Sequence, residues 1–546
     1  MVPVLYRYCL VIICVLLAGF TTVAQPNSVM CSNTPARAWW DVQAYELDIV
    51  FDTATNSISG SNTLLAKVVA PAADSLQLDL QEALQIDSVL MAGKRLQVRG
   101  QGSTYYLSEG FAGMAPGDSF RCTIYYHGAP VMAQRAPWDG GLVRTTDGKG
   151  QLWMAMACQG SGAYMWFPCK NFNGDEPERV TLKYTVPSGL TAIGNGRLRG
   201  KVTTGNTTTY TWSVQNPINN YDITFYIGDY THWSDTFAGA KGPLSLDYYV
   251  LRENEQKARK QFAVVKPMMA CFEEKMGPYP FYEDGYKLVD APYLGMEHQS
   301  AVAYGNEYKM GYLGRDRSKT GVGLTFDFII IHESGHEWFG NSITAYDPAD
   351  TWIQEGFTSY SETIFAECLE GKQASFRYQQ GKKRIIRNDK PVQGQYNACD
   401  EGSGDHYDKG AFVIHMIRMI MDDDTRFFAM LKAISAKFYH QLVTSNDIET
   451  FINQYSGKDF SKLFEQYLRH KELPVLLRQT TATGTAFQWS NCIPGFDMPL
   501  RILLPGNKAT WIYPVAGKWT GYAHKGKIKA DPDFLVGDTP GKPANQ

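Results

Sequence analysis

The stretch Phe328-Ile-Ile-Ile-His-Glu-Ser-Gly-His-Glu-Trp-Phe-Gly-Asn341 decides the local fold and the chemistry of this chain. Its apolar run contains no proline, so it predicts a helix. Residues four apart on a helix lie on one face, which brings the imidazoles of His332 and His336 to one point, as two zinc ligands require. Glu333 stands beside the first histidine, where it can take a proton from a water at the metal. The stretch therefore predicts a metal site with its own base.

These residues match the His-Glu-x-x-His pattern of zinc peptidases. The alternative is a chance match, in a helix whose histidines are hydrogen-bonded core or surface residues. A third ligand favours the metal, because a catalytic zinc takes three protein ligands and keeps one open position. Glu355 follows His336 after eighteen intervening residues, at the start of a second predicted helix. Asp350, near the beginning of that helix, is expected to cap it or to support a ligand.

The spacing of these residues, with Trp338-Phe-Gly-Asn341 and Glu355-Gly-Phe357, resembles the M1 family of zinc aminopeptidases. That family includes aminopeptidase N and leukotriene A4 hydrolase. The resemblance covers nearly all of the chain after residue 24 and places the motif segments in the family's order. It implies one Zn²⁺ per chain, held by His332, His336 and Glu355, with Glu333 as the general base.

Length and charge limit the domain organisation and the classes of partner that can be expected. With 546 residues the chain is too long for one core and suggests several domains. A formal net charge of −3 gives no electrostatic reason to expect nucleic acid or an anionic membrane surface as a partner.

The first 24 residues are typical of a secretory signal peptide. Arg7 supplies a positive start, residues 9–20 are apolar, and Thr22-Val-Ala24 offers small residues for cleavage. An uncleaved membrane anchor is the alternative. We expect an exported protein, periplasmic or extracellular, with no membrane attachment after cleavage and an oligomeric state that the sequence does not give.

Export permits disulfides. Cys9 and Cys14 lie in the signal segment, so eight of the ten cysteines remain, and none of them forms a Cys-x-x-Cys pair. The absence of this spacing argues against a structural zinc knuckle or a thioredoxin-like site. An even number fits disulfides, whereas buried free thiols are an equal alternative.

Residues 25–232 predict an N-terminal domain of antiparallel β-sheets, of sandwich or saddle type. Segments rich in β-forming residues, punctuated by Gly, Pro, Asn and Asp, occur at 45–51, 75–80, 121–126, 181–186 and 221–227. Within this domain, Cys158-Gln-Gly-Ser-Gly-Ala-Tyr-Met-Trp-Phe-Pro-Cys169, followed by Asp175-Glu-Pro177, is similar to an M1 signature that is stretched here by residues 170–174. The resemblance implies that Gln159 helps to hold the substrate's free α-amine. The alternative is a glutamine that satisfies its own loop.

The stretch Tyr293-Leu-Gly-Met-Glu-His-Gln299 resembles the exopeptidase motif Gly-x-Met-Glu-Asn of M1 enzymes, with Glu297 as its carboxylate. A partly buried carboxylate gains a charge-assisted hydrogen bond only from a free amino terminus, so it selects against internal peptide bonds. The resemblance implies that Gly295 and Met296 contact the substrate beside it. Tyr293 is expected to form the floor of the pocket for the first side chain, with a plain core tyrosine as the alternative.

Two positions depart from that motif. Leu294 stands where the family has its first glycine, and His298 stands where it has asparagine. Neither carries the charge that binds the amine. The departures bear on how the substrate backbone is held and on how strict the exopeptidase preference is.

The stretch Asp405-His-Tyr-Asp-Lys-Gly410 is similar to the Tyr-Glu-Lys-Gly motif of M1 enzymes. The resemblance implies that Tyr407 stabilises the negative charge that develops on the former carbonyl oxygen, a task for which a phenol hydroxyl is a suitable donor. The alternative is an ordinary tyrosine at a helix start. We expect His406 on the surface, and residues 369–400 are basic and helical with no recognisable chemistry.

Residues 233–474 are thus expected to form a thermolysin-like, helix-rich catalytic domain, and residues 475–546 a small C-terminal β-sandwich. The fold class is multidomain α+β. The chain stops where many M1 relatives continue into a large helical domain that caps the active site, so we expect a more open cleft.

The sequence therefore predicts an exported zinc aminopeptidase that removes N-terminal residues from peptides with a free amino terminus. Two alternatives remain at this point. One is a zinc endopeptidase with an open cleft, and the other is a catalytically inactive binding protein on the same scaffold. The preferred first residue of the substrate does not follow from the sequence.

Overall fold

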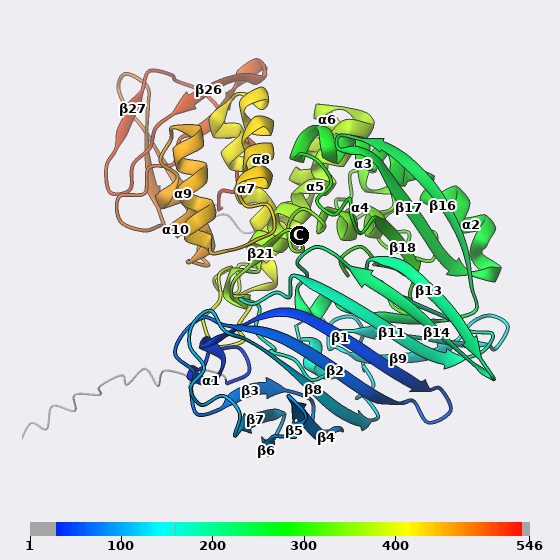
Figure 1. Ribbon diagram of the computed structural model, residues 1–546. Coiled ribbons are helices and arrows are strands. Elements are labelled where there is room, and N and C mark those ends of the chain that lie inside the picture. Colours follow the sequence, from blue (N-terminus) through cyan, green and yellow to red (C-terminus); the bar gives the residue numbers. More distant parts are fainter. Residues whose placement is uncertain (1–28, 159, 538–546) are drawn as a thin grey trace, which may run out of the picture.

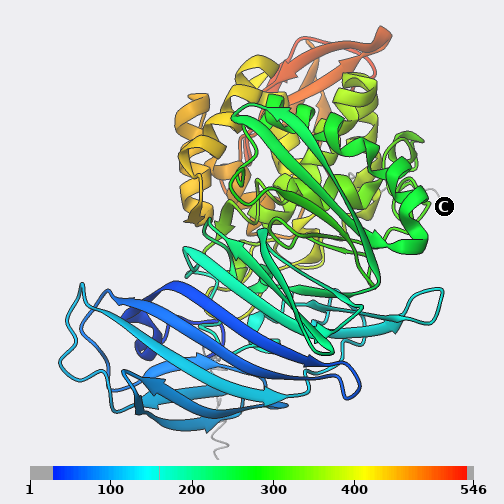
Figure 2. The same ribbon diagram turned by 45° about the vertical axis from the view of Figure 1, so that its right-hand side comes forward.

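The structure is a computed structural model that describes residues 29–158 and 160–537. Three regions follow one another in space as they do along the chain: large β-sheets, a helical region and small β-sheets (Figure 1). Figure 2 shows the same order from another side, with the helices between the two β regions. The predicted fold class is confirmed. The domain limits at residues 232 and 474 stay predictions, and the predicted signal peptide lies outside the described residues.

An eight-stranded sheet dominates the N-terminal region, in the order β13-β14-β11-β1-β2-β8-β4-β5. Buried residues alternate with more exposed ones along much of β1 (Trp40–Asp52), the pattern of a sheet with one face packed on a core. β1 pairs in parallel with β11 (Arg179–Pro187) and antiparallel with β2 (Ser57–Val68). The remaining strands of this sheet are β4 (Leu84–Met91), β5 (Lys94–Arg95), β8 (Ser119–Gly128), β13 (Arg197–Thr204) and β14 (Thr207–Val214).

Two smaller sheets complete this region. One has the order β12-β15-β10-β9 and the other β3-β7-β6. Their strands are β3 (Leu76–Asp79), β6 (Gln97–Gln101), β7 (Thr104–Ser108), β9 (Gly141–Thr146), β10 (Leu152–Ala157), β12 (Thr191–Gly194) and β15 (Phe225–Gly228), and helix α1 (Pro35–Ala38) precedes them all.

The prediction of a strand at residues 221–227 is wrong for the first half of this segment. Tyr221 lies in a 3-10 turn, η2 (Asn220–Asp222), and the strand begins only at Phe225. The side chain of Asn219 accepts a hydrogen bond from the backbone N–H of Tyr221 and so favours a turn at this point.

A five-stranded sheet of order β16-β17-β18-β20-β19 opens the helical region. Its strands are β16 (Tyr230–Gly239), β17 (Gly242–Leu251), β18 (Tyr286–Asp290), β19 (Gly295–Met296) and β20 (Val302–Tyr304). Around it lie α2 (Glu255–Gln261), α3 (Val265–Met276), α4 (Phe328–Gly335), α5 (Trp352–Glu370), α6 (Lys372–Lys382), α7 (Asp408–Met421), α8 (Asp424–Lys437), α9 (Ser445–Ser456) and α10 (Ser461–Leu468). The short parallel pair β21 (Ile343–Ala345) and β22 (Gln441–Val443) joins the loop after α4 to the loop after α8.

Helix α4 begins where the sequence predicts. Asp327 caps it, because its carboxylate accepts hydrogen bonds from the N–H groups of Ile329 and Ile330. The same carboxylate accepts a hydrogen bond from Tyr304 in β20, at 2.7 Å. The cap therefore fixes the start of the metal-site helix to the central sheet.

Helices α5 and α7 cross at two glycines. A Cβ built on Gly410 would lie 3.0 Å from the Cα of Gly356, and one built on Gly356 would lie 3.1 Å from the Cα of Gly410. These distances are shorter than most contacts that real Cβ atoms make, so the two helices meet closely at these glycines. The crossing brings Glu355, next to Gly356, close to Tyr407, which precedes α7.

The C-terminal region consists of two three-stranded sheets, β23-β24-β27 and β26-β25-β28. Its apolar residues continue the core of the helical region, and Tyr467 of α10 donates a hydrogen bond to the carbonyl of Leu535 at 2.6 Å. The strands are β23 (Val475–Thr480), β24 (Thr485–Ser490), β25 (Leu500–Leu504), β26 (Lys508–Ile512), β27 (Thr520–Tyr522) and β28 (Lys529–Ala530).

Both states that the sequence left open for the cysteines occur. Disulfides join Cys31 to Cys399 and Cys271 to Cys368. Free thiols occur at Cys122, Cys158, Cys169 and Cys492. Among the residues that the structure describes, no helix is both long enough and apolar enough to cross a membrane.

We predict that replacing Gly410 by Ala destabilises the protein by about 1 kcal/mol. Overpacking costs roughly 1–3 kcal/mol, and the better helix propensity of Ala recovers about 1 kcal/mol of this. Urea unfolding measures the change. Gly200→Ala in β13 is the control, because a Cβ at Gly200 meets nothing within 4 Å. A Gly410→Ala protein as stable as the wild type would contradict the close crossing.

Candidate active site

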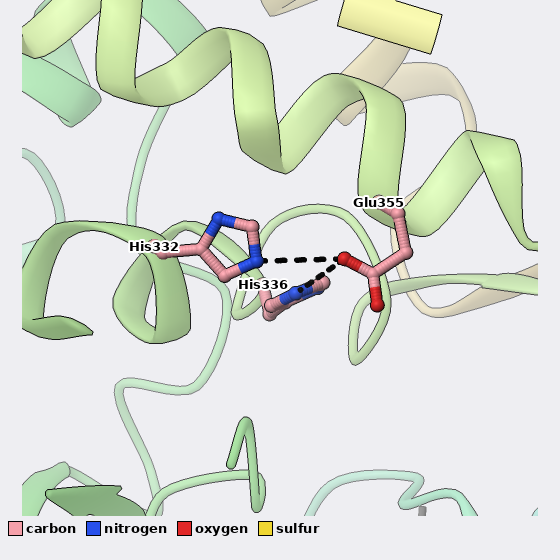
Figure 3. Close-up of side chains that lie close together, drawn as sticks. All are labelled: His332, His336 and Glu355. Atoms are coloured by element: carbon pink, nitrogen blue, oxygen red, sulfur yellow. Dashed lines mark ion pairs between the residues drawn. The ribbon is translucent and has the colours of Figure 1, made fainter. Parts of the chain in front are cut away.

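The three predicted zinc ligands lie together and are buried. The Nε2 atoms of His332 and His336 lie 3.4 and 3.3 Å from the same oxygen, Oε2 of Glu355. Figure 3 shows both imidazoles and the carboxylate pointing to one place, His332 from α4, His336 from the C-cap position just after α4, and Glu355 from α5. The two rings stand nearly perpendicular, at 83°, with centroids 5.0 Å apart. The sequence prediction of a shared ligand point is thus reproduced by the geometry.

Each imidazole is held from behind by its other nitrogen. Nδ1 of His332 lies 2.8 Å from a carboxylate oxygen of Glu362. Nδ1 of His336 lies 3.0 Å from the carbonyl oxygen of Phe339 and 3.2 Å from the hydroxyl of Thr358. Acceptors at Nδ1 favour the tautomer that carries its proton there, which leaves the Nε2 lone pair for a metal.

Glu362, the carboxylate that supports His332, was not predicted from the sequence. It also accepts hydrogen bonds from the Tyr378 hydroxyl at 2.7 Å and from the Lys382 ammonium at 3.0 Å. Although burial acts in the opposite direction, Lys382 and His332 lower the pKa of Glu362 to about 2, so it is ionised. One signal was available: Glu362 lies seven residues after Glu355, two helical turns along the same face.

Asp350 does not have the role that the sequence suggested. Its carboxylate accepts hydrogen bonds from the backbone N–H of Ser445 at 3.0 Å and from the amide of Gln393 at 2.7 Å, besides one from Tyr396. It makes no hydrogen bond to the start of α5 or to a metal ligand among the described residues. Asp350 thus joins the segment before α5 to the start of α9.

The donor set fits zinc. Two imidazole nitrogens and one carboxylate oxygen, all buried and within 4.8 Å of one another, form the kind of ligand set found in catalytic zinc sites. The outer hydrogen bonds to both imidazoles are also those expected around such a metal.

Glu333 lies beside this ligand set and is 7% exposed. Burial raises the pKa of its carboxyl above the ordinary value, the direction that favours taking and returning a proton near neutral pH. A Cβ on Gly295 would lie 2.6 Å from Oε1 of Glu333. Gly295 is therefore needed for the space that this carboxylate occupies.

Glu297 lies close to Glu333 and to His336. Carboxylate oxygens of Glu297 and Glu333 and a ring nitrogen of His336 lie within 4.8 Å of one another. Tyr221 donates a hydrogen bond to Glu297 at 3.1 Å, and the Asn341 amide donates to the Glu297 backbone carbonyl at 2.7 Å. Burial raises the pKa of Glu297.

Tyr221 and Asn341 were not assigned a role from the sequence. The hydroxyl of Tyr221 also accepts a hydrogen bond from the Gln354 amide at 3.2 Å, next to the third ligand. Tyr221 and Glu297 are 76 residues apart in the chain, and no local pattern predicts such a contact. Asn341, by contrast, is the last residue of the metal-site stretch, and this position in the sequence could have indicated a role at the site.

Tyr293 and Met296 lie in the packed wall behind Glu297. Tyr293 donates a hydrogen bond to the carbonyl of Met156 at 3.0 Å, and Met296 is 1% exposed in β19. Tyr293 lines a separate cavity with Trp153, and not the cavities at the ligands. Its predicted contact with a substrate side chain stays a prediction, as does that of Met296.

The histidine that departs from the exopeptidase motif is fully buried. Its Nδ1 lies 2.7 Å from the hydroxyl of Tyr226. Burial lowers the pKa of His298 to about 3, so the ring is neutral and adds no charge beside Glu297.

Tyr407 lies at the start of α7 with its ring 5.8 Å from that of His332. Burial, and then Glu355, raise its pKa well above the ordinary value, so the phenol keeps its proton and can donate it in a hydrogen bond. The neighbouring His406, expected on the surface, is 6% exposed and its ring lies 4.6 Å from that of Tyr407. The crossing of α5 and α7 draws this segment inward, which a single sequence does not reveal. Gln159 lies outside the described residues.

Two cavities meet at the ligands. The larger, of about 640 Å³, is lined by His332, His336, Glu355, Glu297, Glu333 and Tyr407, among others. The smaller, of about 250 Å³, is lined by Tyr221, Glu355, Glu401, His406 and Tyr407, among others. Trp138, which is 59% exposed, lines both.

Comparison with known proteins identifies the domain that contains this site. Residues 261–467, which contain α4, α5 and Tyr407, match the sequence profile described as Peptidase family M1 domain. Residues 261–467 thus form a peptidase family M1 domain. The resemblance inferred from its motifs is thereby confirmed.

The sequence relatives are distant. Aminopeptidase B of Mus musculus is 25% identical over 287 residues, which are 50% of this chain and 41% of that protein. Aminopeptidase B of Homo sapiens is 24% identical over 363 residues, 63% of this chain and 50% of that protein. The matched region thus spans half or less of these relatives' length.

Solved structures show the same fold. An M1 zinc metallopeptidase mutant from Deinococcus radiodurans, bound to a Tyr-Ser-Ala substrate, has a TM-score of 0.67 at 18% identity, covering 82% of this chain and 98% of that one. The unmutated M1 zinc metallopeptidase from the same organism has a TM-score of 0.65 at 20% identity, covering 80% and 95%. At these identities the similarity concerns the fold alone.

We predict that Glu362→Gln weakens zinc binding about 10- to 100-fold, because a neutral amide no longer orients and polarises His332. Competition with a metal chelator measures the affinity. Glu367→Gln, one turn further along α5 and paired with Arg418, is the matched control. Equal zinc affinity of the Glu362→Gln protein and the wild type would contradict this role.

A second prediction concerns His298 and acid stability. Its pKa is about 3 in the folded protein and about 6.5 when unfolded. The unfolded chain therefore binds the proton more readily below pH 6.5, and stability that is complete above this pH is lost as the pH falls. Between pH 7 and pH 5, His298→Asn should lose about 2 kcal/mol less unfolding free energy than the wild type. Urea unfolding at both pH values checks this, and parallel losses would contradict it.

Proposed function

We propose that this chain is a zinc-dependent aminopeptidase that removes the first residue from peptides with a free amino terminus. The observation that carries the proposal is the position of Glu297, a buried carboxylate within 4.8 Å of Glu333 and His336. In one amino-acid residue the amine nitrogen and the carbonyl carbon are about 2.5 Å apart. The space between Glu297 and the ligand point therefore suits a single residue, with its ammonium on the carboxylate.

The proposed reaction distributes its tasks over the residues described above. His332, His336 and Glu355 would hold the zinc ion, which would supply Lewis-acid activation of a water molecule and of the scissile carbonyl. Glu333 accepts the proton of the attacking water and returns it to the leaving amine. The Tyr407 hydroxyl donates a hydrogen bond to the oxygen on which negative charge develops.

Glu297 would hold the ammonium of the substrate, together with Gln159, whose role rests on the sequence resemblance alone. An ammonium is the better partner for a buried carboxylate because an uncharged peptide N–H leaves that charge uncompensated. Tyr221 and Asn341 fix Glu297 through its side chain and its backbone. This arrangement supports an aminopeptidase over an endopeptidase, and the complete set of ligands and base supports an enzyme over an inactive binding protein.

The proposal includes export, to the periplasm or the medium. The signal-like composition of residues 1–24 supports it. Two disulfides in the structure also support it, because disulfides persist mainly in oxidising compartments. The N-terminal sequence of the protein recovered from its cell of origin would test this part.

We predict that Glu333→Gln lowers kcat by about 10²- to 10⁴-fold and leaves zinc in place. The amide keeps the shape of the side chain and cannot accept the proton. A panel of amino-acid arylamides, assayed with and without a chelator, measures the activity and names the preferred first residue. A zinc-loaded Glu333→Gln protein with wild-type activity would exclude Glu333 as the base.

Peptides with a blocked amino terminus separate the proposal from its main alternative. An aminopeptidase does not cleave them, because an acetyl group removes the charge that Glu297 binds. Cleavage of acetylated peptides by the zinc-loaded protein, with no release from the arylamides, would establish an endopeptidase instead.

A further inference from the structure

Four arginines line the larger cavity beside the metal ligands. Arg317 is half-buried and paired with Asp408, whereas the side chains of Arg315, Arg384 and Arg387 are exposed. They come from two segments, the loop before α4 and the turn after α6, which meet at this cavity. We call these three residues the basic rim.

The basic rim has no acidic partner of its own. No ion pair within 4 Å involves any of the three guanidinium groups, as far as the described part of the chain shows. Arg384 donates a hydrogen bond to the backbone carbonyl of Arg317. These positive charges therefore face the cavity uncompensated.

The carboxylates that line the same cavity are already engaged elsewhere. Asp316 accepts hydrogen bonds from backbone N–H groups of its own loop, and Asp405 accepts them from the N–H groups of Arg387 and Asn388. Asp408 lies 2.8 Å from Arg317 and 3.4 Å from Lys382. The remaining acidic residues, Glu297, Glu333 and Glu355, belong to the site described above.

The position of Glu333 shows which part of a substrate meets the basic rim. Glu333 lines the larger cavity and is not among the residues that line the smaller one. A residue that returns a proton to the leaving amine must lie within hydrogen-bond reach of it. The leaving part of the peptide therefore extends into the larger cavity, toward the three arginines.

We propose that the basic rim binds a carboxylate in the leaving part of the substrate, so that the protein prefers short peptides with a free C-terminal carboxylate. This inference rests on the proposed aminopeptidase function. Guanidinium groups bind carboxylates by paired, charge-assisted hydrogen bonds. A cavity of about 640 Å³ is large enough for a few residues. An acidic side chain at the same place would present the same chemistry.

The test measures peptide binding in the Glu333→Gln protein, which keeps the peptide intact. The ligands are Xaa-Ala-Ala, its C-terminal amide, and Xaa-Ala-Glu amide, where Xaa is the residue preferred in the arylamide panel. Titration calorimetry gives each Kd. We expect the free acid to bind roughly three- to ten-fold more tightly than the neutral amide, and this ratio to shrink in 0.5 M salt because exposed charges are screened.

Arg315→Gln, Arg384→Gln and Arg387→Gln should each lower that ratio, and the triple variant should bring it to about one. Arg99→Gln is the matched control, since it removes the same charge from an exposed position on β6. If Glu333→Gln fails to fold, KM values of the wild type for the free acid and the amide replace the Kd values.

The outcomes separate the two proposals. Preference for the free acid, or for the amide that carries glutamate, supports the basic rim and identifies the source of the carboxylate. Equal binding of all three peptides, no binding of any, or a preference that survives in the triple variant would overturn it. Zinc-dependent release from arylamides can still succeed in each case, whereas its failure would overturn the aminopeptidase itself.

Discussion

The imidazole of His332 is clamped between two carboxylates of one helix, and the rest of the site depends on this arrangement. Glu355 and Glu362 lie two turns apart on α5, so both side chains leave the same face. One meets Nε2 of the imidazole at 3.4 Å and the other meets Nδ1 at 2.8 Å. A single rigid element thus sets both the third metal ligand and the tautomer of the first. Any rotation of α5 would disturb both contacts at once. The packing and the hydrogen bonds around α5 oppose such a rotation.

A series of charged residues continues from Glu362 into the walls of the cleft. Glu362 binds Lys382 at the end of α6, Lys382 lies 3.4 Å from Asp408 at the start of α7, and Asp408 binds Arg317 in the loop before α4. A buried carboxylate is costly unless it is paired and hydrogen-bonded, so each member of this series keeps its neighbours in place. The glycine crossing of α5 and α7 acts alongside it. Together they connect the metal ligands with Tyr407 and with both segments of the basic rim.

The sequence predicted what depends on local spacing and failed where distant segments meet. Four-residue spacing on α4 placed His332 and His336, and family motifs placed Glu355, Glu297 and Tyr407. Glu362 follows from helix geometry, but no motif draws attention to it. Asp350 and Tyr221 were misjudged because their partners lie on other segments, the start of α9 and the loop after β19 that bears Glu297. His406 was misjudged because the helix crossing draws its own segment inward. The fold class was predictable from composition, since strand-like and helical segments are separated along the chain, whereas the contacts between regions were not.

Two charged features of the larger cavity, Glu297 and the basic rim, differ in how strongly their charges act. Glu297 is buried, so a substrate that brings no positive charge leaves its carboxylate desolvated and unpaired, and the resulting penalty is large. The arginines of the basic rim are exposed, and water and salt solvate them when no carboxylate is bound, so their absence of a partner costs little. The amino end of a peptide is therefore subject to a strict requirement and the carboxyl end to a graded preference. A protein built in this way would act fastest on short peptides that carry both charges and would still accept longer ones, with a selectivity that ionic strength alone could change.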